Sequence, residues 1–72
     1  MKKIIRIMLD EILDERDITR YELAKLANLP YATIDRYYKN KVVRYDSETI
    51  RRICLALDCT PGDLIRLVET EE

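Results

Sequence analysis

The sequence predicts an all-α domain of five helices, and three observations support this fold class. The 72 residues include one glycine and two prolines, neither phenylalanine nor tryptophan, and no turn typical of a β-hairpin. Leucine, isoleucine, arginine, lysine and glutamate are abundant, as in many helical proteins. Residues that cap helices precede apolar residues at helical spacing. A chain of this length forms one domain, residues 1–72, and buries only about 60% of its unfolded surface.

The first predicted helix runs from about Lys3 to Arg16. Its buried stripe follows the helical repeat and comprises Ile5, Leu9, Ile12 and Leu13. Three apolar residues lie outside this stripe: Ile4, Ile7 and Met8. They either widen the core contact or belong to a dimer seam, and we favour the wider core contact.

The second predicted helix begins with a capping box, in which Thr19 and Glu22 each satisfy a backbone N–H group of the first turn. Its inner face comprises Leu23, Ala24 and Ala27. Asn28 follows the last helical residue and tolerates the left-handed backbone that ends a helix. We therefore expect a tight turn here, and a helix-turn-helix over about residues 20–39.

The third predicted helix spans about Pro30 to Lys39, because proline has the φ angle of a first helical turn. Ile34 continues the inner apolar stripe with Tyr37 or Tyr38, and Asn40 ends the helix. The outward face differs from an ordinary solvated surface rich in Glu and Lys. It carries a mixture of hydrogen-bonding groups: Tyr31, Ala32, Thr33, Asp35, Arg36 and Lys39.

The last two predicted helices also have start signals. Asp46 caps the fourth helix, while Thr60 caps the fifth, with Pro61 at its first position and Asp63 completing a capping box. The inner face of the fourth helix comprises Ile50, Ile53, Cys54 and Leu57. The fifth helix has more apolar residues than one face requires: Leu64, Ile65, Leu67 and Val68. We expect the acidic tail, residues 69–72, to be frayed and solvated.

Four groups of residues match one family pattern in register: Thr19, Glu22, Leu23, Ala24 and Ala27; Thr33, Ile34, Arg36 and Lys41; Asp46, Glu48, Thr49, Ile53, Cys54, Ala56, Leu57 and Cys59; and Pro61, Gly62, Asp63 and Leu64. Over almost its whole length the chain resembles the lambda-repressor-like (Cro/CI or Xre type) helix-turn-helix regulators, in particular their small single-domain form. The resemblance implies a five-helix lambda-repressor-like domain that regulates transcription as a repressor. Its third helix would read the major groove of a double-stranded DNA operator.

The resemblance assigns two sets of residues to DNA. The base-contacting set is Tyr31, Ala32, Thr33, Asp35 and Arg36. The backbone-contacting set is Arg20, Lys39, Asn40, Lys41 and Arg44. Arg36 is suited to paired hydrogen bonds with guanine, which provide about 1–3 kcal/mol of discrimination. Asp35 is suited either to accept a hydrogen bond from cytosine or to pair with Lys39 four residues later, and both readings stand.

The chain departs from the family pattern at several positions. Asn28 and Asn40 stand at the usual glycines, and Pro30 replaces the usual Ser or Thr cap, so the third helix loses one capping hydrogen bond. Val43 stands where a cation is common, and Asp35 where a small neutral residue is common. We expect these departures to weaken DNA affinity without abolishing it.

The charges are segregated along the chain. The formal net charge is only −1, but residues 20–44 carry six cations against two acids, whereas residues 46–72 carry three cations against seven acids. A positive field therefore accompanies the helix-turn-helix and the loop after it. We expect the acidic C-terminal half to face away from DNA phosphates.

Several classes of function are disfavoured. The chain has no histidine and no phosphate-binding loop, so we expect no catalytic residues, and its two cysteines lack the further ligands of a metal site. We read Cys54 as a core residue and Cys59 as a buried or half-buried thiol in a turn, with a disulfide or redox role disfavoured. No apolar run is long enough to span a membrane. We expect a cytoplasmic protein without a cofactor, and no small-molecule effector is evident.

Two functions from different classes remain open. The leading one is a homodimeric regulator on a two-fold operator, with half-sites about 34 Å apart. The alternative is a protein-interaction module, such as an antitoxin-like or anti-repressor partner, that uses apolar surface of the first and last helices.

Overall fold

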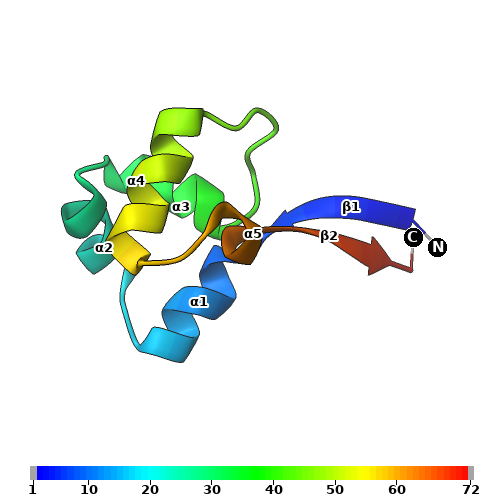
Figure 1. Cartoon of the computed structure of the whole chain (residues 1–72), viewed down its shortest axis with the longest axis horizontal. Helices are drawn as coiled ribbons and strands as arrows, with labels where there is room; N and C mark the ends of the chain where they lie inside the picture. The colour runs from blue at the N-terminus through cyan, green and yellow to red at the C-terminus, as the bar shows by residue number, and fades with distance from the viewer. Residues whose placement is uncertain (1, 72) are drawn as a thin grey trace.

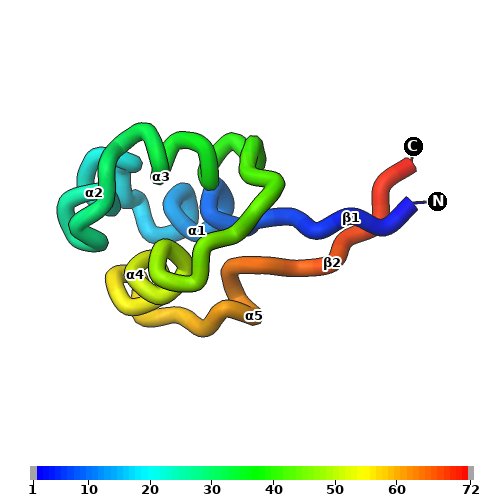
Figure 2. Tube along the Cα trace, turned by 90° about the horizontal axis from the view of Figure 1, so that it is seen from above, coloured from blue at the N-terminus to red at the C-terminus, as the bar shows by residue number. Residues whose placement is uncertain are grey.

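A computed structural model describes residues 2–71 of the chain. Five helices form a compact body, and a two-stranded ribbon projects from one end of it (Figures 1 and 2). In chain order the elements are β1 Lys2–Ile7, α1 Leu9–Arg16, α2 Arg20–Ala27, α3 Tyr31–Tyr38, α4 Ser47–Leu57, α5 Pro61–Leu64 and β2 Ile65–Thr70. Five helices are present, as predicted. The all-α class needs correction, because a sheet joins the two ends of the chain.

The ribbon is an antiparallel pair of strands. Lys2 lies opposite Thr70 at its tip, and Ile7 lies opposite Ile65 where the ribbon enters the body. The tip of the ribbon therefore lies away from α2 (Figure 1).

The first predicted helix, Lys3 to Arg16, is wrong in its first half, since α1 begins at Leu9. The last predicted helix is also wrong in part, because α5 ends at Leu64 and the residues after it, Ile65, Leu67 and Val68 among them, belong to β2. Both errors have one cause. Each segment is short and apolar, so its spacing fits a strand as well as a helix, and β-branched residues favour the strand once a partner strand is available.

Burial in β1 rises toward the helical body instead of following a helical stripe: residues 2–5 are exposed, Arg6 is half-buried and Ile7 is buried. Ile7, predicted to lie outside the buried stripe, is fully buried, whereas Ile5, predicted to be buried, is 50% exposed. The predicted burial of Leu9 and Leu13 is confirmed. Glu69 belongs to β2 and is not frayed, while Glu72 lies outside the described residues.

The core lies between α1, α2, α3 and α4, with α5 closing one end. Its fully buried large side chains are Ile7, Leu9, Leu13, Leu23, Ile34, Ile53, Leu57 and Leu64. The inner faces predicted for the second, third and fourth helices are confirmed by this set and by buried Ala24, Ala27, Tyr37, Ile50 and Cys54.

The predicted helix caps are confirmed. Capping boxes are formed at α2 by Thr19 and Glu22 and at α5 by Thr60 and Asp63. The carboxylate of Asp46 accepts a hydrogen bond from the Thr49 N–H at the start of α4. These caps fix where each helix begins and therefore how the helix-turn-helix is oriented in the body.

Candidate nucleic-acid interface

A tight turn sets the angle between α2 and α3. Asn28 ends α2 with a left-handed φ of 55°, as predicted, and the Leu29 N–H donates to the Ala24 carbonyl at 3.0 Å. Pro30 occupies the N-cap position of α3, one residue before the helix, and provides no side-chain cap. The predicted loss of a capping hydrogen bond at this helix is confirmed.

The inner face of α3 anchors it in the body. Ile34 is fully buried, and Tyr37 is buried with its hydroxyl oxygen accepting a hydrogen bond from the Asp46 N–H at 3.4 Å. This bond joins α3 to the start of α4 across the loop. Tyr37 is therefore a core residue, as its spacing indicates, and Tyr38 is half-buried beside it.

The outer face of α3 presents the predicted base-contacting residues together. Ala32 and Arg36 are exposed, while Tyr31, Thr33 and Asp35 are half-buried. Residues three and four positions apart are neighbours on a helix, so the helical repeat places Ala32 beside Asp35 and Arg36.

Asp35 holds two of the predicted backbone-contacting cations. Its carboxylate pairs with the Lys39 ammonium at 3.2 Å and with the Arg20 guanidinium at 2.6 Å. These contacts, first that with Lys39 and then that with Arg20, hold the pKa of Asp35 below its usual value. The ion pair with Lys39 is thus formed, and Asp35 also links α2 to α3 through Arg20. The sequence did not reveal the Arg20 contact, because it depends on how the two helices cross.

Aromatic rings surround Arg20 at the same junction. Its guanidinium lies 4.6 Å from the ring centroid of Tyr38 and 5.9 Å from that of Tyr31. Tyr31 in turn stacks on Tyr21 of α2, with centroids 4.3 Å apart and planes 20° apart. Tyr21 was missed by the sequence analysis, and no spacing within one helix would have identified it. The stack places the exposed ring of Tyr21 beside the half-buried Tyr31 at the start of α3.

The loop after α3 continues the basic surface. Lys41 and Arg44 are exposed, and Val43 between them is 93% exposed. Asn40 has the predicted left-handed backbone, with φ of 57°. Its side-chain amide, however, accepts from the Ile7 N–H at 2.7 Å and donates to the Ile7 carbonyl at 3.0 Å. Asn40 therefore joins this loop to β1, and its contact with DNA stays a prediction.

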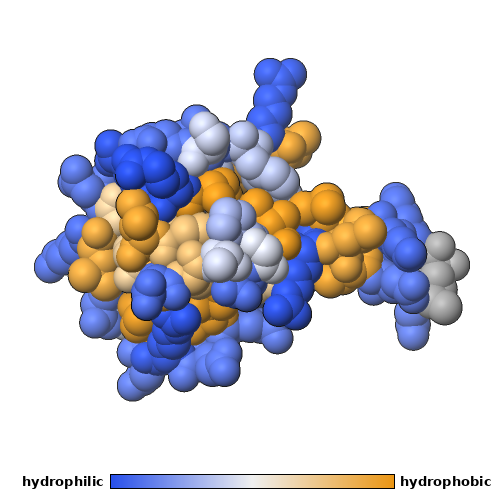
Figure 3. Space-filling view, in the orientation of Figure 1, coloured by the Kyte–Doolittle hydropathy of each residue, from blue (hydrophilic) through white to orange (hydrophobic). Residues whose placement is uncertain are grey.

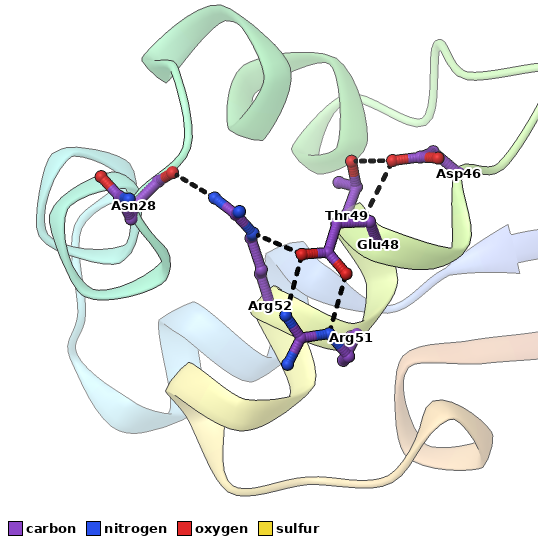
Figure 4. Close-up of polar contacts among 6 residues, drawn as sticks. All are labelled: Asn28, Asp46, Glu48, Thr49, Arg51 and Arg52. Carbon is purple, nitrogen blue, oxygen red and sulfur yellow. Dashed lines mark hydrogen bonds and ion pairs between the residues drawn. The ribbon is translucent and has the colours of Figure 1, made fainter.

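Arg52 of α4 contacts the turn between α2 and α3 (Figure 4). Its guanidinium donates to the Asn28 carbonyl at 3.0 Å and pairs with Glu48 at 3.0 Å. Glu48 also pairs with Arg51 at 2.8 Å, and the two guanidinium groups, Arg51 first, lower the pKa of Glu48 to about 2. This chain of contacts fixes the end of α2 relative to α4.

Other kinds of site find little support in residues 2–71. No helix there has the length and apolar character to span a membrane, and no cluster of three or more His, Cys, Asp or Glu side chains is placed to hold a metal ion. Cys54 is buried, Cys59 is half-buried, and both are free thiols. Burial, and then the neighbouring Cys54, raise the pKa of Cys59 to about 11, which disfavours the reactive thiolate.

Comparison with known protein families gives one match to the whole domain. The model of the Cro/C1-type HTH DNA-binding domain matches residues 8–70, which include all five helices and the whole of β2. No curated protein matches the sequence significantly.

Proposed function

Because the chain belongs to the Cro/C1-type helix-turn-helix DNA-binding domain family, we propose that it is a sequence-specific repressor that reads the major groove with α3. The family makes it a DNA-binding transcription regulator. The proposed operator has two-fold symmetry, the active form is a homodimer, and the protein acts in the cytoplasm.

The main support is the outer surface of α3 and the loop after it. Arg36 is exposed on the face that family geometry turns toward base edges, and Ala32 beside it is suited to contact a thymine methyl group. The cations Lys39, Lys41 and Arg44 are exposed at the end of α3 and in the loop after it. This arrangement provides one direct reader and several groups that position it on phosphates.

The proposal is tested by selection from a random duplex library with the purified protein at moderate salt. We expect enrichment of a two-fold motif with half-sites about one helical turn apart. Arg36→Gln should weaken binding to the enriched site by about 10- to 100-fold, corresponding to the loss of a paired contact with guanine, and should relax selection at one base position.

The control is Lys25→Gln, which removes an exposed cation of α2 outside the proposed contact set. It should leave the enriched motif unchanged. No enrichment even at low salt would contradict the proposal and favour a protein-interaction module. A test of that module at Ile7 is unsuitable, because Ile7 is fully buried and its substitution would unfold the domain.

A further inference from the structure

Exposed apolar side chains occur on several elements of the domain. Figure 3 shows apolar surface on the helical body and on the ribbon. Single exposed residues of this kind, such as Leu55 of α4, are ordinary on protein surfaces. Tyr21 of α2 differs from them, because it is 66% exposed and its ring also contacts α3.

This contact joins the second residue of α2 to the first residue of α3. The ring centroids of Tyr21 and Tyr31 lie 4.3 Å apart, and the ring planes differ by 20°. A side chain on a helix surface otherwise exchanges between staggered rotamers, and a ring stacked against it excludes the rotamers that would occupy the same space. Tyr21 therefore restricts the orientation of the Tyr31 ring.

The start of α3 has few other side-chain contacts of this kind. Pro30 occupies its N-cap position and provides no side-chain cap. One turn later, the ion pair of Asp35 with Arg20, at 2.6 Å, joins α3 to α2. The stack and the ion pair are thus neighbouring contacts between the two helices, and the stack is the one that holds the first residue of α3.

The position of Tyr31 indicates what its ring could contact on DNA. In a helix-turn-helix, the first residues of the reading helix lie at base edges, while the preceding helix crosses the DNA backbone. An aromatic ring presents apolar surface, and the apolar group that distinguishes one base from the others in the major groove is the C5-methyl of thymine. Tyr31 is half-buried, so part of its ring remains accessible for such a contact.

We propose that Tyr21 is a positioning residue for sequence recognition, which holds Tyr31 by ring stacking so that the Tyr31 ring contacts a thymine methyl group. The inference rests on the proposed function and adds to it a residue outside the two contact sets that the family resemblance assigns. Tyr21 acts through Tyr31 and does not touch the base. The stack needs the ring of Tyr21 and not its hydroxyl, so Tyr21→Phe should preserve the contact and Tyr21→Ala should remove it.

The test replaces thymine by deoxyuracil, one position at a time, in the duplex that the wild type enriches. This change removes one methyl group and keeps the base pair and its hydrogen-bonding groups. For the wild type, we expect a position at which the change weakens binding about fourfold, as for one buried methyl group. Tyr31→Ala and Tyr21→Ala should bind the two duplexes equally at that position. A thymine contacted by Ala32 should stay sensitive in both variants.

Two control variants should keep the methyl dependence of the wild type. Tyr21→Phe retains the ring, and Leu26→Ala shortens a 63% exposed side chain of the same helix outside the stack. The positioning role is overturned if the wild type has no such thymine, if the dependence persists in Tyr31→Ala or Tyr21→Ala, or if either control loses it. Each of these results leaves the DNA-binding proposal in place. A wild type that enriches no duplex removes both proposals.

Proton NMR tests the stack without DNA. The ring current of Tyr21 should shift the Tyr31 ring protons upfield in the wild type, and Tyr21→Ala should return them toward their ordinary positions. Because Tyr21 is exposed, we expect this variant to fold, and unchanged methyl resonances of the buried Ile34 verify that it does. Tyr31 resonances that are the same in the wild type and in Tyr21→Ala would overturn the stack and, with it, the positioning role.

Discussion

Asn40 connects two parts of the fold, one through its backbone and one through its side chain. Its left-handed backbone ends α3, and its amide pairs with the edge of β1. Asn28 has a matching backbone, with φ of 55°, and an exposed side chain at the end of α2. The backbone of both residues could be predicted from the tolerance of asparagine for this conformation. The bond from Asn40 to β1 could not, because it joins residues 33 positions apart.

Asn40→Gly should therefore destabilise the protein although glycine suits the backbone. The variant leaves the N–H and carbonyl of Ile7 without their partner, which costs about 1–3 kcal/mol of unfolding free energy. Urea denaturation measures this change. Asn28→Gly is the matched control, and we expect a change within about 0.5 kcal/mol of zero or a slight gain. Equal effects of the two variants would show that the amide bond to β1 contributes nothing.

Asp35→Asn distinguishes the two roles of this carboxylate. As an ion-pair partner, Asp35 competes with phosphates for Arg20 and Lys39, so the variant should bind DNA several-fold more tightly. As a reader of cytosine, it would instead lose affinity only for sites with cytosine at one position. Competition binding with the enriched duplex and its base-substituted versions separates these outcomes. Tighter binding to all duplexes is the result we expect.

Lowering the pH should weaken the contribution of Asp35 to folding. Its folded-state pKa lies below its ordinary value, so the ion pairs stabilise the protein fully above that ordinary value. The contribution is lost as the pH falls through the lower folded-state pKa. Asp35→Asn should lack this part of the pH dependence.

Among the elements, the capped starts of α2, α4 and α5 could be predicted, whereas the uncapped start of α1 and the two strands could not. A cap is a local pattern, and Thr19 with Glu22 forms it within four residues. Strands β1 and β2 depend on each other across almost the whole chain, and neither segment alone distinguishes a strand from a helix. The candidate interface shows the same limit, since the helical repeat grouped Ala32 with Arg36 but could not place Tyr21 against Tyr31.

The pH dependence of stability in Glu48→Gln tests how α4 stabilises the turn of the helix-turn-helix. Its pKa of about 2 lies below the ordinary value of 4.5, so its ion pairs stabilise the fold fully above about pH 4.5 and are lost as the pH falls toward 2. Glu48→Gln should be less stable than the wild type at pH 5–7, and the difference should vanish near pH 2. Thermal unfolding across this range measures it.

The matched control for this experiment is Glu15→Gln, at an exposed glutamate of α1 outside the network. It should follow the wild type at each pH. A constant difference between wild type and Glu48→Gln down to pH 2 would mean that the ionised carboxylate does not stabilise the turn.

At the scale of the whole molecule, charge separation matters more than net charge. The acidic residues of positions 46–72 offset the basic residues of positions 20–44. The formal net charge of −1 therefore does not reveal that positive and negative charges lie in different parts of the chain. Figure 2 shows α2 and α3 along one side of the body and α4 and α5 along the other. Folding therefore turns a separation along the sequence into a separation in space, with the basic segment on the side proposed to face DNA.

The salt dependence of DNA binding tests this distribution. Four cations are proposed to contact phosphates: Arg20, Lys39, Lys41 and Arg44. Each phosphate neutralised by such a contact adds about −0.9 to the slope of log affinity against log salt, so one domain should give roughly −3 to −4. Lys41→Gln or Arg44→Gln should each make the slope smaller by about 1 without changing the preferred sequence.

Lys25→Gln provides the control for these loop variants, because Lys25 lies in the same basic segment but outside the proposed contact set. Its slope should equal that of the wild type, although it removes the same formal charge. If all three variants reduced the slope equally, the positive segment would attract DNA only through its overall field, and the loop after α3 would not lie on the phosphates. A reduction confined to Lys41 and Arg44 would instead place that loop against the DNA backbone, with α3 in the adjacent groove.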